Sequence, residues 1–144
     1  MSHAMSRAER EEFLAALHVG VIAVTVDDRP LAVPIWYDYT PGGDVWIITA
    51  PTSIKGRALD ATGRYSLCAQ TEQPPYKYVT VEGPITEVQE STPDVVRSMA
   101  HRYLGAELGD AYVEATSAES GENRVYRMTP QRWYTVDYSK DFAG

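Results

Sequence analysis

The sequence has one cysteine and no long apolar run, and these two shortages limit the kind of protein that it can encode. Cys68 has no second cysteine with which to form an internal disulfide, and no Cys/His spacing typical of a zinc site occurs, so we expect no metal site. No uninterrupted apolar stretch approaches the roughly 18 residues that a membrane-spanning helix needs. The charged N-terminus also lacks the apolar segment of a signal peptide. These features predict a cytoplasmic protein with no membrane partner.

Positive charge is in the minority. The chain has 13 Lys and Arg residues against 20 Asp and Glu residues, which gives a formal net charge of −7. A general electrostatic affinity for nucleic acid is therefore not expected, and any site for an anion must be formed locally.

Recognisable catalytic motifs are also missing. The sequence has neither the Gly-x-Gly-x-x-Gly pattern of dinucleotide-binding folds nor a Walker loop. His18 and His101 are the histidines beyond the first five residues, and neither lies in a hydrolase motif. We therefore assign no catalytic residue from the sequence.

The length of 144 residues fits one globular domain of ordinary size. Residues 1–5, Met1-Ser2-His3-Ala4-Met5, resemble an expression-vector remnant ahead of a native start at Met5. We expect a single domain over residues 6–144.

Runs of apolar and β-branched residues alternate with turn residues along most of the chain, which predicts strands joined by short turns. The expected strands cover residues 21–26, 31–39, 45–50, 64–71, 76–88, 124–128 and 133–138. Helices are expected after Ser6, over residues 53–61 and after Thr92, and a polar region over residues 108–122 should separate the last helix from the last strands. The predicted fold class is mainly β, an antiparallel barrel of six to seven strands with helices packed outside.

Two prolines indicate where this sheet is irregular. Pro34 cannot donate to a strand ladder, so it predicts an edge strand or a bulge whose backbone groups are free to meet a ligand. The pair Gly83-Pro84 lies inside a long alternating segment and predicts a bend there, as a barrel requires.

The most informative polar cluster lies at the start of the predicted helix at residues 53–61. The hydroxyl groups of Thr52 and Ser53, the free amides of a helix start and the two cations Lys55 and Arg57 together form a compact anion site that suits a phosphate. The alternative is an ordinarily capped helix whose charged residues face solvent.

Aromatic residues are the second feature, because most of them lie on or beside predicted strands. They could line an apolar cleft for a flat ring or fill the core. Tyr37 and Tyr39 could donate a proton to a substrate, and a place in the core explains them equally well. The set comprises Trp36, Tyr37, Tyr39, Trp46, Tyr76, Tyr78, Trp133, Tyr134 and Tyr138.

In order and spacing, several segments resemble the pyridoxamine 5′-phosphate oxidase-like family of flavin-binding split β-barrels, and especially its flavin- and deazaflavin-dependent oxidoreductase branch. The resemblance covers roughly Phe13 to Tyr138. The segments that carry it are Gly20-Val21-Ile22-Ala23-Val24, Arg29-Pro30-Leu31-Ala32-Val33-Pro34-Ile35-Trp36-Tyr37, Val45-Trp46-Ile47-Ile48-Thr49 leading into Ser53-x-Lys55-x-Arg57, and Tyr78-Val79-Thr80-Val81-Glu82-Gly83-Pro84.

The resemblance implies a split barrel and a set of cofactor-binding residues. Lys55, Arg57 and Ser53 would hold the cofactor phosphate, and Thr49 and Ala50 would touch the ribityl chain. The residues implied to run beside the flavin or deazaflavin ring are Val33, Pro34, Ile35 and Trp36. Members of the family are generally homodimers with cofactor sites at the interface, so the resemblance further implies that the second subunit contributes Tyr76, Lys77 and Trp133.

The implied cofactor is FMN or the deazaflavin coenzyme F420, which share the ribityl phosphate, so the cation pair does not distinguish them. The implied function is an oxidoreductase that transfers hydride to or from a small unsaturated or quinone-like substrate. The sequence lacks the arginine-rich C-terminal segment with which vitamin B6 oxidases bind their own substrate, because Arg127 and Arg132 are isolated.

Two other functions remain open at this point. One is a non-catalytic carrier or sensor that holds a flavin, haem or another tetrapyrrole on the same fold. The other is a β-barrel interaction module that binds no small ligand.

Overall fold

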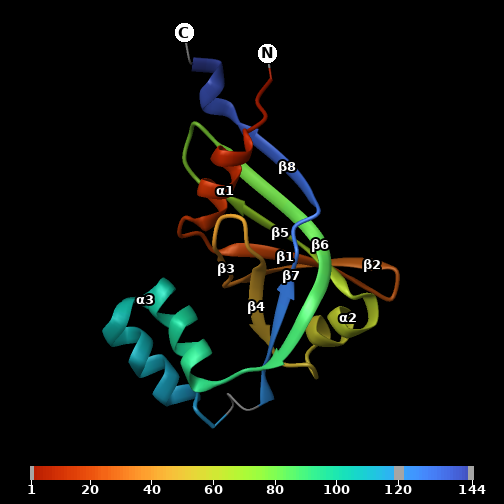
Figure 1. Ribbon diagram of the computed structural model, residues 1–144, viewed down its shortest axis with the longest axis vertical. Coiled ribbons are helices and arrows are strands. Elements are labelled where there is room, and N and C mark those ends of the chain that lie inside the picture. Colours follow the sequence, from red (N-terminus) through yellow and green to blue (C-terminus); the bar gives the residue numbers. More distant parts are fainter. Residues whose placement is uncertain (1, 119–121, 143–144) are drawn as a thin grey trace.

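The computed structural model describes residues 2–118 and 122–142, and within them one antiparallel sheet curls around the core (Figure 1). The strands are β1 (Gly20–Val26), β2 (Arg29–Ile35), β3 (Asp38–Tyr39), β4 (Val45–Thr49), β5 (Arg64–Gln70), β6 (Lys77–Glu90), β7 (Arg124–Met128) and β8 (Arg132–Asp137). The helices are α1 (Arg7–Ala15), α2 (Ile54–Thr62) and α3 (Pro93–Thr116), with a short 3-10 helix at Tyr138–Phe142.

The strand order is β2-β1-β5-β6-β7-β4-β3, and β8 pairs with β6 beside this path. All pairings are antiparallel. The predicted mainly β fold, an antiparallel split barrel with helices outside, is confirmed. The segment expected as one strand over residues 31–39 is divided into β2 and the two-residue β3.

The 14-residue strand β6 holds the two parts of the barrel together. Its first part pairs with β5 and β8, and its second part pairs with β7 after a register shift between Ile85 and Glu87. A Cβ atom at Gly83 would lie 1.9 Å from the carbonyl oxygen of Thr129, so the close approach of the chain at the bend requires glycine there. The predicted bend at Gly83-Pro84 is therefore confirmed.

The hairpin of β1 and β2 turns through Asp27 and Asp28, both with positive φ, as a two-residue turn of this kind requires. Because Val26 pairs with Arg29 at the turn, alternation of the ladder points the backbone groups of Pro30, Ala32 and Pro34 away from β1. β2 is an edge strand, as Pro34 predicted, and its two prolines remove donors from the free edge. The carbonyl groups along that edge are still able to accept hydrogen bonds.

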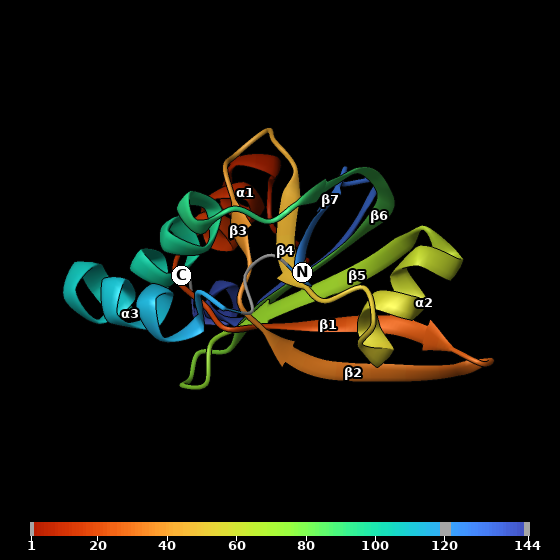
Figure 2. The same cartoon turned by 90° about the horizontal axis from the view of Figure 1, so that it is seen from below.

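Side chains alternate between the two faces of the strands β2-β1-β5-β6-β8. The inner face is apolar and buried around Ile22, Leu67 and Val81, and α1 and α2 pack Leu14 and Leu59 into the same core. The outer face carries the charged residues Arg64, Glu82 and Arg132 together with small or weakly polar residues that are half-buried or exposed: Ala32, Pro34, Val21, Ala23, Ser66, Cys68, Thr80, Tyr134 and Val136. In Figure 2 the hairpin of β1 and β2 forms the lower edge of the molecule.

α3 differs from the sequence prediction. The helix continues to Thr116, so the polar region over residues 108–122, expected to separate it from the last strands, supplies much of its second half. Gly105 has a φ of 81° and a ψ of 177°, so the chain reverses there, and the two arms lie side by side (Figure 1). A Cβ atom at Gly109 would lie 3.0 Å from the backbone nitrogen of His101, which shows how closely the arms approach. Apolar periodicity could not reveal this because the second arm is mostly exposed.

Candidate functional site

The start of α2 carries the predicted cation cluster. Ser53 is the N-cap of the helix: its hydroxyl accepts a hydrogen bond from the Gly56 amide (2.9 Å) and donates one to the Ala50 carbonyl (2.7 Å). A Cβ atom at Gly56 would lie 2.0 Å from the Ala50 carbonyl oxygen, so only glycine allows the first turn to pack against the end of β4. The local sequence thus fixes where the helix starts and where its amides point.

Lys55 is half-buried and Arg57 is exposed, and neither has an ion-pair or hydrogen-bond partner among the described residues. The Gly56 and Arg57 amides are bonded to Ser53, which leaves the amides of Ile54 and Lys55 at the helix start. The first turns of α2 thus carry two cations without partners and free amides at the positive end of the helix, which are groups that can bind a phosphate.

A cavity of about 240 Å³ lies between α3 and the sheet. Its walls come from the end of β2, from β4, from both arms of α3 and from the segment before β7. The lining residues are Ile35, Trp36, Ile48, Val96, Met99, Tyr112, Thr116 and Asn123. Two residues predicted from the resemblance, Ile35 and Trp36, therefore lie together in one apolar cavity.

The Trp36 indole packs with one face against Tyr103 of the first arm of α3. It stacks on the Tyr103 ring with the centroids 5.0 Å apart and the planes 6° from parallel. The Tyr103 hydroxyl donates to the His18 carbonyl (2.6 Å) and accepts from the Tyr37 amide (3.1 Å). Burial raises the pKa of Tyr103 above its ordinary value, so the hydroxyl keeps its proton and its role as donor.

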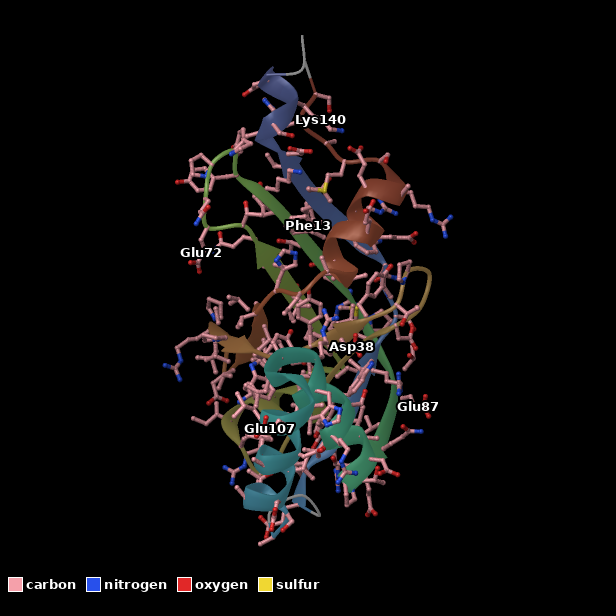
Figure 3. The ribbon with its side chains drawn as sticks, turned by 90° about the vertical axis from the view of Figure 1, so that its left-hand side faces the viewer. Phe13, Asp38, Glu72, Glu87, Glu107 and Lys140 are labelled. Carbon is pink, nitrogen blue, oxygen red and sulfur yellow. The ribbon has the colours of Figure 1, made fainter. Side chains whose placement is uncertain are left out.

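Arg102 fastens the first arm of α3 to the rest of the molecule. Its guanidinium donates to the carbonyls of Tyr37 (2.9 Å), Ala15 (3.2 Å) and Ala16 (3.0 Å) and lies 3.4 Å from the Asp38 carboxylate. Figure 3, which looks onto α3, shows Asp38 beside the upper end of that helix. The wall of the cavity that the first arm supplies is therefore fixed.

β4 connects the cavity to the cation cluster. Ile48 lines the cavity, and the next residue, Thr49, places its hydroxyl 3.3 Å from that of Ser53. Thr49 and Ala50 join β4 to the start of α2, and their contact with a ribityl chain remains a prediction. In Figure 2 α2 and α3 lie on opposite sides of β4.

The other predicted site residues lie elsewhere. Val33 packs against the main core and Pro34 is exposed on the outer face of β2. Trp133 is half-buried on the inner side of the sheet, with the Arg10 guanidinium 4.6 Å from its ring centroid. Lys77 Nζ lies 4.0 Å from the Asp137 carboxylate.

Tyr76 is about half exposed. Within one chain Tyr76, Lys77 and Trp133 are not among the residues that line the cavity. A contribution from them to a site formed with a second subunit remains a prediction.

Tyr37 and Tyr39, the two candidate proton donors, are core residues. The Tyr37 side chain is fully buried and its hydroxyl donates to the Leu14 carbonyl (2.6 Å), while the Tyr39 hydroxyl accepts from the Gly42 amide (3.3 Å). Burial raises the pKa of both tyrosines. The placement of Tyr37 is that of a structural tyrosine.

Sequence reasoning missed the part of the cavity that α3 supplies. Val96 and Met99 were recognisable as the apolar face of a helix, but nothing in the sequence indicated what that face would cover. Tyr112, Thr116 and Asn123 lay in or beside the region expected to be irregular and gave no signal.

Among the described residues, no group of three or more His, Cys, Asp and Glu side chains could hold a metal ion. No helix in those residues is long and apolar enough to span a membrane.

Comparison with known proteins identifies relatives of this fold. A family model described as pyridoxamine 5′-phosphate oxidase matches residues 6–135. No curated protein matches the sequence significantly.

Several solved structures are similar. A conserved hypothetical protein from Mycobacterium tuberculosis, Rv2991, has a TM-score of 0.76 at 22% identity, over 96% of this chain and 89% of that one. A structure named F420 reductase has a TM-score of 0.64 at 16% identity, over 86% and 94%. A haem-binding protein from Mycobacterium smegmatis has a TM-score of 0.60 at 18% identity, over 97% and 61%. At these identities the similarity shows the fold.

Proposed function

Because the chain belongs to the pyridoxamine 5′-phosphate oxidase family, we propose that it is an oxidoreductase that binds FMN or coenzyme F420 and transfers hydride to or from a small unsaturated or quinone-like substrate. The observation that carries the proposal is the pair Lys55 and Arg57 in the first turns of α2, which has no partner among the described residues. Two such cations can bind the anionic tail of a flavin-type cofactor. The solved F420 reductase with the same fold supports the cofactor class.

The residues of this chain fit such a cofactor. Lys55, Arg57 and the amides at the start of α2 would hold the phosphate, while Ser53 stays engaged as the helix cap. The free edge of β2 offers carbonyl groups to the polar edge of a ring, and Ile35 and Trp36 shield its apolar part from water. A bound flavin or deazaflavin supplies the hydride chemistry, and this chain supplies binding, orientation and exclusion of water.

The proposal includes a homodimer. The outer face of β2-β1-β5-β6-β8 has small or weakly polar side chains around Val21, Cys68 and Thr80, and its charged residues Arg64, Glu82 and Arg132 lie to one side of them. Small, weakly polar side chains on a sheet face allow a second copy to approach closely, and charged residues are depleted at the centre of protein interfaces. The free edge of β2 borders this face, so a partner seated on it would lie next to the proposed ring site.

The test is a titration of the purified protein with FMN and with coenzyme F420, after denaturation of a sample to identify any chromophore by its spectrum and mass. Lys55→Ala and Arg57→Ala should each weaken binding of one cofactor about 10-fold or more, because each removes a charge-assisted contact to the phosphate. Arg29→Ala, which removes an exposed cation from the tip of the β1–β2 hairpin, is the matched control and should leave the affinity unchanged.

The proposal fails if the wild type binds neither cofactor, or if the two variants bind as tightly as the control. A wild type that binds neither cofactor would favour an interaction module without a small ligand, and in that case replacing both Lys55 and Arg57 with Ala should leave every activity unchanged.

A carrier or sensor is the second candidate, and the haem-binding protein of the same fold is the observation that favours it. A protein of that kind would hold its cofactor without turnover. Bound flavin that NAD(P)H never reduces and acceptors never reoxidise would support the carrier, and steady turnover with any acceptor would exclude it.

A further inference from the structure

We propose that the cavity beneath α3 binds an uncharged molecule of one or two fused rings, and that Tyr112 and Asn123 select this molecule through hydrogen bonds to a carbonyl oxygen. The idea that this molecule reacts with the cofactor rests on the proposed function. The idea that the molecule binds in the cavity is independent of the proposed function.

The size of the cavity limits its ligand. A volume of about 240 Å³ is below the roughly 300–1,000 Å³ of pockets for drug-sized ligands, yet it equals several times the volume of about 30 Å³ that one water occupies in the liquid. A molecule of one or two rings fits this range, and a cofactor with a long tail does not fit inside it. The cavity therefore accommodates a small ligand beside the proposed cofactor site.

The walls determine the charge of the ligand. Ile35, Ile48, Val96 and Met99 present apolar side chains, and none of the eight lining residues is a carboxylate or a cation. An ion brought into such surroundings would lose hydration and would find no opposite charge in the lining, which is unfavourable. A neutral molecule has no such penalty, so the cavity should bind neutral molecules in preference to anions. Lys55 and Arg57, which would attract anions, lie on α2 and do not line the cavity.

The aromatic walls favour a flat ligand. Stacking on Tyr103 fixes the plane of the Trp36 indole, and the Tyr112 ring lies 5.4 Å from it at an angle of 49°. A planar ring can stack on one of these surfaces and meet the other with its edge, which are the two preferred aromatic geometries. Because Trp36 is held before any ligand arrives, little side-chain entropy is lost on binding.

Two lining residues have polar groups that no other group uses. The Tyr112 hydroxyl and the Asn123 side-chain amide have no hydrogen-bond partner in the described part of the chain, whereas the Thr116 hydroxyl already donates to the Tyr112 carbonyl (2.8 Å). Both free groups can donate to a carbonyl oxygen. A neutral ring with a carbonyl group satisfies them without introducing a charge.

Contacts between the arms of α3 hold Tyr112 over the cavity. Asp110, one half-turn before Tyr112, accepts from His101 Nε2 (2.7 Å) and from Arg97 Nε (3.2 Å) on the first arm. Gly105 joins the arms, and its positive φ is unfavourable for other residues. The second arm is thereby fixed as the outer wall of the cavity.

The test uses the full-length protein without added cofactor and two probes, 2-methyl-1,4-naphthoquinone and the anionic 1,4-naphthoquinone-2-sulfonate, in calorimetric titrations. The neutral quinone should bind at least 10-fold more tightly than the sulfonate. Val96→Phe, which fills the cavity, should weaken quinone binding at least 10-fold. Tyr112→Phe and Asn123→Ala should each weaken it about 3- to 10-fold, as expected for one hydrogen bond.

Leu108→Phe is the control, because Leu108 is 64% exposed on the same arm and does not line the cavity. It should bind the quinone like the wild type. Tyr112→Phe removes a single hydroxyl from a partly exposed ring and should fold normally, so the test does not depend on Val96→Phe. Equal binding of the two probes, no binding of the quinone, or equal affinity of the wild type and the Tyr112 and Asn123 variants would overturn the proposal.

The same proteins are then titrated with FMN and coenzyme F420. If the wild type binds the quinone and neither cofactor, the proposal for the cavity holds and the proposed function is wrong. If it binds a cofactor and no quinone, only the proposal for the cavity is wrong.

Discussion

At the scale of single residues, the buried tyrosines show how polar groups are placed in the core. Tyr65 donates to a backbone carbonyl of β4 or β7 (3.1 and 3.0 Å), Tyr126 donates to Asp60 (3.2 Å), and Tyr37 donates to Leu14. Burial raises the pKa of all three, which keeps them neutral donors. Several tyrosines thus lie inside the barrel, where each hydroxyl bonds to another element.

Replacing Tyr37 with Phe should destabilise the protein without affecting cofactor binding. The change leaves the Leu14 carbonyl without its buried donor, and such a loss costs about 1–3 kcal/mol of unfolding free energy. Urea denaturation measures the difference, and Tyr138→Phe, at a 43% exposed tyrosine, is the control with a change near zero. A Tyr37→Phe protein as stable as the wild type would contradict the structural role given to this hydroxyl.

At the scale of the elements, the N-terminal end of α1 is held by hydrogen bonds and by a contact with the last element of the chain. α1 has a complete capping box between Ser6 and Glu9, and Lys140 of the C-terminal 3-10 helix donates to the same carboxylate (2.9 Å). The hydrogen bond from the Ser6 amide, followed by that from Lys140, lowers the pKa of Glu9 from about 4.5 to about 2. One carboxylate therefore joins the first helix to the last element.

The stabilising effect of Glu9 should depend on pH. The unfolded chain takes up the proton at the ordinary pKa, so the contribution is fully present above about pH 4.5 and is lost as the pH falls toward 2. Glu9→Gln keeps the hydrogen bond from Ser6 and loses the charge. Its unfolding free energy should be lower than that of the wild type at pH 6, and the difference should vanish near pH 2.

Glu12→Gln removes the same charge from an exposed side chain of α1 and serves as the matched control for this series. Chemical denaturation at several pH values from 2 to 7 follows both variants. A difference between wild type and Glu9→Gln that stays constant over this range would refute the assignment.

At the scale of the whole molecule, one face of the sheet has no cover in the described structure while the other encloses the core. The outer face presents Ala23 at its centre, between Ala32 on β2 and Ser66 on β5. Burial of this face between two copies would place the second copy beside the proposed ring site.

Ala23→Glu should therefore convert a dimer into a monomer and weaken cofactor binding with it. The charge would lie at the centre of the proposed interface, where leaving it unpaired is costly. Light scattering across a range of concentrations gives the mass, and Ala106→Glu, at an exposed position of α3, is the control that should remain dimeric. A monomeric wild type, or an Ala23→Glu protein that dimerises normally, would argue against this interface.

The sequence alone determined the strands, the helix starts and the irregular points of the sheet. These depend on signals within a few residues of each other: the caps at Ser6, Ser53 and Thr92, the missing amide of Pro34, and the bend at Gly83-Pro84. The cation cluster belongs with them because it lies within one helical turn. The resemblance added the expectation that residues 33–36 lie beside a ring, and the cavity contains two of these four.

Only the tertiary structure decided what meets across the barrel. Trp36 and Tyr112 are 76 positions apart, and no local pattern could show that Gly105 reverses α3 and brings the second arm back over the sheet. The same holds for Tyr37, whose hydroxyl bonds to α1, and for Trp133, whose ring lies under the Arg10 guanidinium. Local preferences fix the conformation of each segment, whereas burial of apolar surface and pairing of buried polar groups between distant segments fix their neighbours.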